Sequence, residues 1–128
     1  MKVGIVPGAM KPYHAGHHYL VETAIASCDK VIILTTTKTR GIISGDGMRT
    51  IWEDYIMPWF NVTHGGKVEV RFVTSPIRSV YVDFIERLEE QGPDGNEYLI
   101  YGGTEDLARF ASDKLKANYP TAAKYIMN

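Results

Sequence analysis

Short apolar runs alternate with helical patterns along this chain, and the alternation limits the folds open to it. The apolar runs have the length of β-strands and cover residues 2–6, 31–35, 68–73 and 98–101. Between them, apolar side chains recur at helical spacing over residues 20–28, 51–59 and 80–88. Strands and helices in this order predict parallel strands with right-handed helical crossovers. We therefore expect an α/β fold, a Rossmann-like three-layer sandwich with a mostly parallel sheet of about four to five strands.

Length and charge narrow the class of protein. With 128 residues, the chain can form a sheet covered on both faces, so we expect one domain over residues 1–128. The net charge of −1 argues against nucleic acid or a membrane surface as a partner, and no apolar run approaches the ~20 residues of a spanning helix. The chain enters its first strand directly, which predicts no signal peptide. Its single cysteine, Cys28, is expected in the core, without a disulfide, in a cytoplasmic protein.

The segment after the first strand has the layout of an anion-binding site. Pro7, Gly8 and Pro12 prevent the strand from running directly into a helix, and His14 and His17 stand where that helix begins. A helix start presents unpaired backbone N–H groups and the positive end of the helix dipole, and both favour negative charge. His17 lies one turn before the apolar stripe and His14 lies just outside the helix, so the two imidazoles can converge on one phosphate.

The other histidines admit plainer interpretations. A single histidine near a helix end is usually a cap or a surface residue, and we expect this of His18 and His64. His14 and His18 have the i, i+4 spacing of a zinc pair. No third ligand stands at a suitable spacing, so we expect no metal site built by the protein itself.

Residues 8–17 read Gly-Ala-Met-Lys-Pro-Tyr-His-Ala-Gly-His. This segment resembles the G-x-F-x-P-x-H-x-G-H signature of the cytidylyltransferase-like nucleotidyltransferase superfamily, with methionine in the usual aromatic place. The resemblance implies that His14 and His17 hold the phosphates of a nucleoside triphosphate and stabilise the transition state. It implies that Lys11 reaches the phosphates or the acceptor; a solvated loop lysine is the alternative. It also implies a nucleotide-binding loop formed by Pro7, Gly8, Ala9, Met10 and Gly16.

A second glycine-containing segment follows the second strand, over residues 40–49. Ser44 or Asp46 can cap a helix that begins near Gly47, and Arg49 offers a planar fork for phosphate. The segment resembles the superfamily motif I-S-x-T-x-x-R, but Asp46 replaces the threonine and the motif lies early in the chain. It is also similar to the N-P-F-T-x-x-E-R segment of nicotinamide and nicotinate mononucleotide adenylyltransferases, which its placement favours. Either alignment implies that Ser44 and Arg49 contact phosphate; a helix cap with a surface arginine is the alternative.

Two more candidates follow the later strands. Gly102 and Gly103 allow a nucleotide to approach the backbone closely, and the corresponding loop of the family contacts base and ribose. Asp106 is the acidic residue implied there, and compensation of a helix dipole is its alternative. Arg78 lies in a predicted loop after the third strand. It is a candidate for the phosphate of the acceptor, or a solvated arginine.

The aromatic residues are divided between core and site. Trp52 and Trp59 lie on the apolar stripe of residues 51–59, so we expect them in the core rather than stacked on a ligand. Tyr13 lies in the first loop and is the better candidate for stacking on a planar group of the acceptor.

These segments predict a nucleotidyltransferase. A phosphate of the acceptor would attack the α-phosphorus of a nucleoside triphosphate and release pyrophosphate, so positioning and charge stabilisation supply the catalysis. Small molecules are the expected partners, and Mg²⁺ bound mainly through the triphosphate is the expected cofactor. We expect ATP and an acceptor such as nicotinamide mononucleotide. A cytidylyltransferase acting on a polyol or amino-alcohol phosphate and a non-catalytic nucleotide-binding module are alternatives. Assembly into a homo-oligomer is also compatible with the sequence.

Overall fold

The computed structural model describes residues 1–10, 13–38, 44–103, 107, 110 and 112–127. Its strands form one sheet in the order β3-β2-β1-β4-β5, and every neighbouring pair is parallel. Their bounds are β1 (Lys2–Pro7), β2 (Lys30–Thr35), β3 (Val68–Phe72), β4 (Glu97–Ile100) and β5 (Ile126–Met127). The predicted Rossmann-like α/β fold is confirmed, and four strands lie within one residue of their predicted bounds. The short strand β5 was not predicted.

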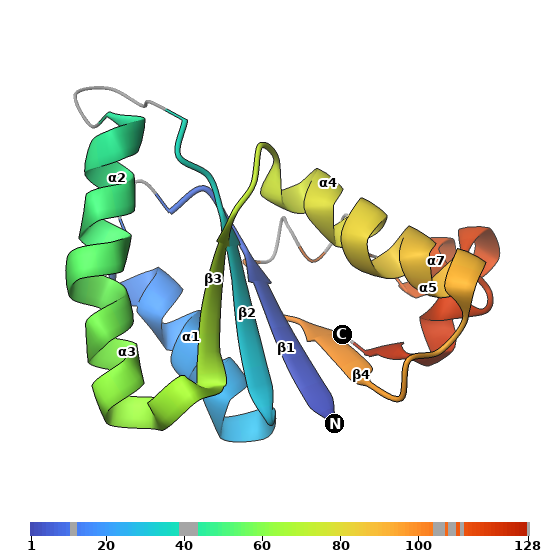
Figure 1. Ribbon diagram of the computed structural model, residues 1–128. Coiled ribbons are helices and arrows are strands. Elements are labelled where there is room, and N and C mark those ends of the chain that lie inside the picture. The colour runs from blue at the N-terminus through green and yellow to red at the C-terminus, as the bar shows by residue number, and fades with distance from the viewer. Residues whose placement is uncertain (11–12, 39–43, 104–106, 108–109, 111, 128) are drawn as a thin grey trace.

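Helices cover both faces of this sheet, as Figure 1 shows. One face carries α1 (Ala15–Ser27), α2 (Gly45–Ile51), the π-helical turn η1 (Trp52–Ile56) and α3 (Met57–His64). The other carries α4 (Pro76–Val80), the π-helical turn η3 (Tyr81–Glu86), α5 (Arg87–Gln91) and α7 (Ser112–Asn118). The short 3-10 turns η2 (Gly65–Lys67) and η4 (Ala122–Lys124) precede β3 and β5. Within the described part of the chain, none of these helices has the length and apolar character needed to span a bilayer.

Side chains that alternate along the strands form a separate core with each helical layer. Val6, Val31 and Ile33 pack with α1 and with Trp52, whereas Ile5 and Leu34 pack with α4 and η3. The predicted stripe of α1 is buried at Val21, Ala24, Ile25 and Cys28. Burial of these apolar surfaces is the main favourable term in holding the layers together.

Close packing of α1 on β1 depends on Gly4. A Cβ atom at this position would lie 3.1 Å from both the Ala24 Cβ and the Cys28 Sγ. The side chain of glycine is a single hydrogen, so the strand and the helix can approach each other here. This contact fixes the helix that carries the two histidines of the predicted site.

The predicted apolar stripe over residues 51–59 is wrong in its phase. Trp52 and Phe60 are fully buried, whereas Ile51, Tyr55 and Trp59 are 38%, 71% and 46% exposed. Met48, Trp52 and Phe60 are buried and Ile56 is partly buried, so the inward positions repeat every four residues. An α-helix makes a turn in 3.6 residues, and the wider π-helical turn over Trp52–Ile56 absorbs the difference. Trp52 is therefore a core residue as predicted, and Trp59 is not.

Candidate functional site

The first loop of the chain lies at the topological switch point of the sheet. Strands β2 and β3 extend from one side of β1, and β4 lies on its other side. The segments after β1 and β4 therefore meet at the carboxyl ends of neighbouring strands, which is the usual ligand position in open parallel sheets. Backbone hydrogen bonds from Gly8 N to Leu34 O (2.9 Å) and from Tyr101 N to Ile5 O (2.8 Å) tie both segments to this edge.

Buried side chains and a hydrogen bond hold residues 7–10, at and after the end of β1, against the core. Pro7 and Met10 are buried, Gly8 is partly buried and Ala9 is exposed. Met10 has a positive φ of 50°, which is uncommon for a residue with a side chain. The Thr35 hydroxyl donates to the Ala9 carbonyl at 2.9 Å. The Met10 side chain therefore packs in the core, whereas Gly8, Ala9 and Gly16 are the parts of the predicted nucleotide loop that solvent reaches.

His14 is the N-cap of α1. Its Nδ1 accepts a hydrogen bond from the Gly16 N–H at 3.0 Å. An imidazole nitrogen is therefore the N-cap acceptor, where a hydroxyl or carboxylate oxygen is more usual. Gly16 makes the arrangement possible, because a Cβ at residue 16 would lie 2.9 Å from the Cε1 of His14. Residue 16 is therefore a glycine because any larger side chain would clash with the imidazole of His14.

His17 completes the cap from inside the helix. The Nδ1 of His17 accepts from the His14 backbone N–H at 3.3 Å, which gives a reciprocal capping box. The two imidazole rings are stacked, with centroids 3.7 Å apart and planes inclined by 25°. Burial of the ring, and then the charge of His14, hold the pKa of His17 below its ordinary value.

These contacts determine where each neutral imidazole carries its proton. A ring nitrogen that accepts from a backbone N–H has no proton of its own, so the proton of both rings lies on Nε2. His14 is exposed and His17 partly exposed. The cap therefore leaves two stacked imidazoles, each with an Nε2–H that can donate to an oxygen of an approaching anion.

Tyr13 and His18 form a separate network beside this pair. The Tyr13 ring lies 6.0 Å from the His17 ring and 5.1 Å from that of Trp52. Burial, and then the negative charge of Glu22, raise the pKa of Tyr13, so its hydroxyl stays protonated. The Tyr13 hydroxyl lies 2.8 Å from the Nδ1 of His18, and the His18 Nε2 lies 3.3 Å from Glu22.

Both nitrogens of His18 are thus engaged within the protein. Glu22 also contacts the Nε2 of His64 at 3.2 Å. Because His18 and Glu22 both lie on α1, the contact of Glu22 with His64 is the one that joins α1 to α3, and the Nε2 atoms of both histidines are engaged with this carboxylate. Tyr13 packs against His17, and its stacking on an acceptor stays a prediction.

The second predicted segment lies partly within the described chain. Ser44 caps α2 as predicted, accepting from the Gly47 N–H at 3.0 Å. Arg49 is exposed; its guanidinium lies 4.3 Å above the Phe72 ring and 3.3 Å from Glu53. Phe72 ends β3, so Arg49 stands at the same edge of the sheet as the first loop. An exposed ion pair of this kind holds a guanidinium weakly, and the arginine can turn to a phosphate.

Arg78 lies in helix α4, and the prediction that it lies in a loop is wrong. Ser75 accepts from the Arg78 N–H at 3.4 Å and Pro76 occupies the first turn, a combination that starts helices. The Arg78 side chain is exposed, as is Gly103, whereas Gly102 is partly buried. Lys11 and Asp106, two predicted site residues, lie outside the described residues.

The structure thus places four predicted segments at one edge of the sheet. These are the loop and cap of residues 7–10 and 13–17, the start of α2, the start of α4 and the glycines after β4. Two supporting residues were missed from sequence. Thr35 fixes the loop through Ala9 and Phe72 supports Arg49. A polar residue at the end of an apolar strand was the available signal for Thr35, whereas nothing local points to Phe72.

Among the described residues, no group of histidine, cysteine and acidic side chains could hold a metal ion. The donors at the site are imidazole and guanidinium N–H groups, which suit phosphate oxygens rather than Mg²⁺. No protein-family model and no curated protein matches the chain.

Proposed function

We propose that this protein is a nucleotidyltransferase. It would transfer the nucleoside monophosphate of a nucleoside triphosphate, with ATP preferred, to a small phosphorylated acceptor such as nicotinamide mononucleotide, and release pyrophosphate. The observation that supports this most is the reciprocal cap of α1, which leaves the Nε2–H groups of His14 and His17 available. The resemblance of residues 8–17 to the superfamily signature supplies the reaction.

The chemistry requires no nucleophile from the protein. An oxygen of the acceptor phosphate forms a bond to the α-phosphorus, and the bond from that phosphorus to the bridging oxygen of pyrophosphate breaks. Charge gathers on the α-phosphate oxygens and on the leaving pyrophosphate. Donors that stand in place before the reaction stabilise this charge without reorganising, and removing one such donor typically costs about 10²-fold or more in rate.

Each group at the site has a role in this proposal. His14 and His17 donate to oxygens at the reacting phosphorus, and Arg49 pairs with the outer phosphates. The dipole of α1, a helix of 13 residues, adds partial positive charge at the same place. Mg²⁺ would supply further charge neutralisation, held mainly by the triphosphate oxygens.

Acceptor-dependent release of pyrophosphate tests the proposal. ATP and CTP are each assayed with Mg²⁺ against nicotinamide mononucleotide, nicotinate mononucleotide, phosphopantetheine, glycerol phosphate and choline phosphate. Release with ATP and one of the two pyridine mononucleotides is the expected result. Release with CTP and an alcohol phosphate would identify a cytidylyltransferase instead. Binding of triphosphate without release in any combination would favour a non-catalytic nucleotide-binding module.

A further inference from the structure

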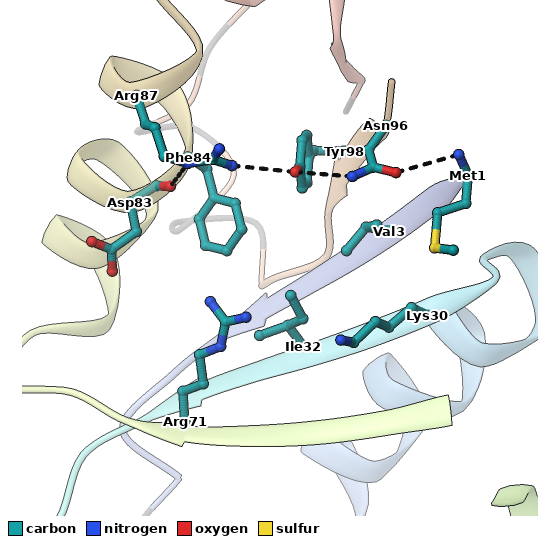
Figure 2. A pocket seen from close by; sticks show the side chains of 10 residues that line it. All are labelled: Met1, Val3, Lys30, Ile32, Arg71, Asp83, Phe84, Arg87, Asn96 and Tyr98. Atoms are coloured by element: carbon teal, nitrogen blue, oxygen red, sulfur yellow. Dashed lines mark hydrogen bonds between the residues drawn. The ribbon is translucent and has the colours of Figure 1, made fainter. Parts of the chain in front are cut away.

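A cavity lies on one face of the sheet, between the strands and the helical layer of η3 and α5, and its lining begins at the amino-terminal residues Met1 and Val3. It has a volume of about 430 Å³, which is within the range of small-molecule sites. Figure 2 shows Val3, Ile32 and Phe84 at its apolar surface, with Lys30 and Arg71 rising from the sheet and Arg87 reaching from the helical layer. Val3 on β1 lies five residues before Gly8, which follows the strand, and five residues span about 16 Å in extended chain. The cavity is therefore separate from the candidate active site.

The edge strand β3 places charged side chains on the face of the sheet that is otherwise apolar. Glu69 and Arg71 on β3 are in register with Ile32 and Leu34 on β2. Register partners in a parallel sheet face the same side, and Ile32 and Leu34 belong to the core beneath α4 and η3. Arg71 therefore projects beside that core, where its guanidinium lies 5.9 Å from the Phe84 ring.

Among the side chains that line the cavity, three are cationic and one is acidic. Lys30 Nζ and an Arg71 nitrogen contact the same oxygen of Glu69, at 3.5 and 3.1 Å. Two cations thus share one carboxylate, and Glu69 itself does not line the cavity. Arg87 pairs with Asp94 at 3.2 Å, and that carboxylate also accepts from the Tyr98 hydroxyl.

One acidic residue, Asp83, does line the cavity. Its carboxylate accepts from the Ser79 hydroxyl within the helical layer, and its backbone carbonyl accepts from Arg87 Nε at 2.8 Å. The Arg87 guanidinium is thereby held at the cavity. The side chains of Lys30 and Arg71 are 42% and 43% exposed, and ion pairs at this exposure are weak, so an incoming anion can replace Glu69 as their partner.

We propose that this cavity binds a phosphomonoester with an apolar or aromatic organic group. Lys30, Arg71 and Arg87 come from three different elements, an arrangement that suits the three outer oxygens of a phosphate better than the two coplanar oxygens of a carboxylate. An arginine can hold two of these oxygens at once, and a lysine acts as a point charge. The organic group would lie on Ile32 and Phe84. This site is independent of the proposed transferase activity.

The test is a titration of the 128-residue chain with phenyl phosphate, followed through the backbone amide signals in NMR spectra. The expected result is saturable shifts of Arg71, Phe84 and Tyr98. Inorganic phosphate lacks the aromatic group and phenol lacks the charge, so each should bind more weakly than phenyl phosphate. Shifts confined to the surroundings of His14 and His17 would overturn the proposal, because phenyl phosphate would then occupy only the candidate active site.

Arg71→Gln is the decisive variant, and Lys116→Gln on α7 is its control because it removes the same charge from an exposed position away from the cavity. Loss of one charged hydrogen-bonding group should weaken binding of phenyl phosphate by about tenfold or more in Arg71→Gln. Lys116→Gln should bind as the parent does. Equal weakening in both variants would contradict the proposal, since it would indicate general attraction to positive charge. The amide spectra themselves show whether each variant is folded.

Discussion

Replacing Gly16 with alanine should separate the proposed catalytic role of the cap from its role in stability. The new Cβ would lie 2.9 Å from Cε1 and 3.1 Å from Nδ1 of His14. The His14 side chain is exposed and can rotate away, so the clash is relieved by loss of the cap rather than by unfolding. His14 then no longer holds its Nε2–H in place.

Two opposing terms set the effect of Gly16→Ala on stability. Loss of an N-cap hydrogen bond costs about 1 kcal/mol, and alanine in place of glycine in a helix gains up to about 1 kcal/mol. The free energy of unfolding should therefore change by less than about 1 kcal/mol. Turnover should fall by about 10²-fold or more, because one pre-positioned donor is lost.

Urea unfolding and pyrophosphate release, measured on the same preparations, check this prediction. Gly66→Ala is the matched control, because nothing lies within 4 Å of a Cβ at residue 66 and its φ of −83° is accessible to alanine. It should leave turnover unchanged. A Gly16→Ala protein that keeps most of its turnover would refute the reasoning, as would one whose loss of turnover follows from unfolding.

Three other predictions concern single side chains. The pKa of His17 is lowered in the folded protein, so near and below pH 6.5 the unfolded chain binds more protons than the folded one. The free energy of unfolding should therefore fall as the pH is lowered through this range. His17→Gln should weaken this pH dependence, which urea unfolding on either side of pH 6.5 measures. Trp52→Ala should lower the free energy of unfolding by about 3–5 kcal/mol, because the side chain is fully buried. Trp59→Ala should lower it by about 1 kcal/mol or less, because Trp59 is exposed. Chemical unfolding of the two variants distinguishes the observed helix phase from the predicted one. Arg49→Gln should raise the KM for the triphosphate by about tenfold and leave the melting temperature nearly unchanged; an unaltered KM would remove Arg49 from the site.

Strands β1 to β4 could be predicted from sequence because a short local pattern of residues marks each of them. Each buried strand is a short apolar run, and the stripe that starts at Val80 repeats as the structure shows it. The phase of residues 51–59 could not be predicted, because Ile51, Tyr55 and Trp59 are large hydrophobic residues that the structure leaves exposed, so hydropathy does not mark the buried face of this segment. The pairing of β5 with β4 involves two residues, too few for a recognisable pattern.

The candidate site was predicted in its position but not in its contacts. The spacing of His14 and His17 indicated that the rings converge, and the structure stacks them. Their use as a reciprocal cap depends on ring orientation, which spacing does not determine. The contact of His64 with Glu22 joins residues 42 positions apart, and the approach of Arg49 to Phe72 depends on the packing of α2 on β3. Such long-range contacts follow from the fold as a whole.

The measurement that tests the central claim most directly is acceptor-dependent pyrophosphate release by His17→Ala at saturating triphosphate. His64→Ala is the matched control, because His64 contacts Glu22 and the side chains of α3 rather than the paired imidazoles. The account predicts that His17→Ala loses about 10²-fold or more in turnover while His64→Ala resembles the parent. A His17→Ala protein that keeps most of the parent turnover would contradict it.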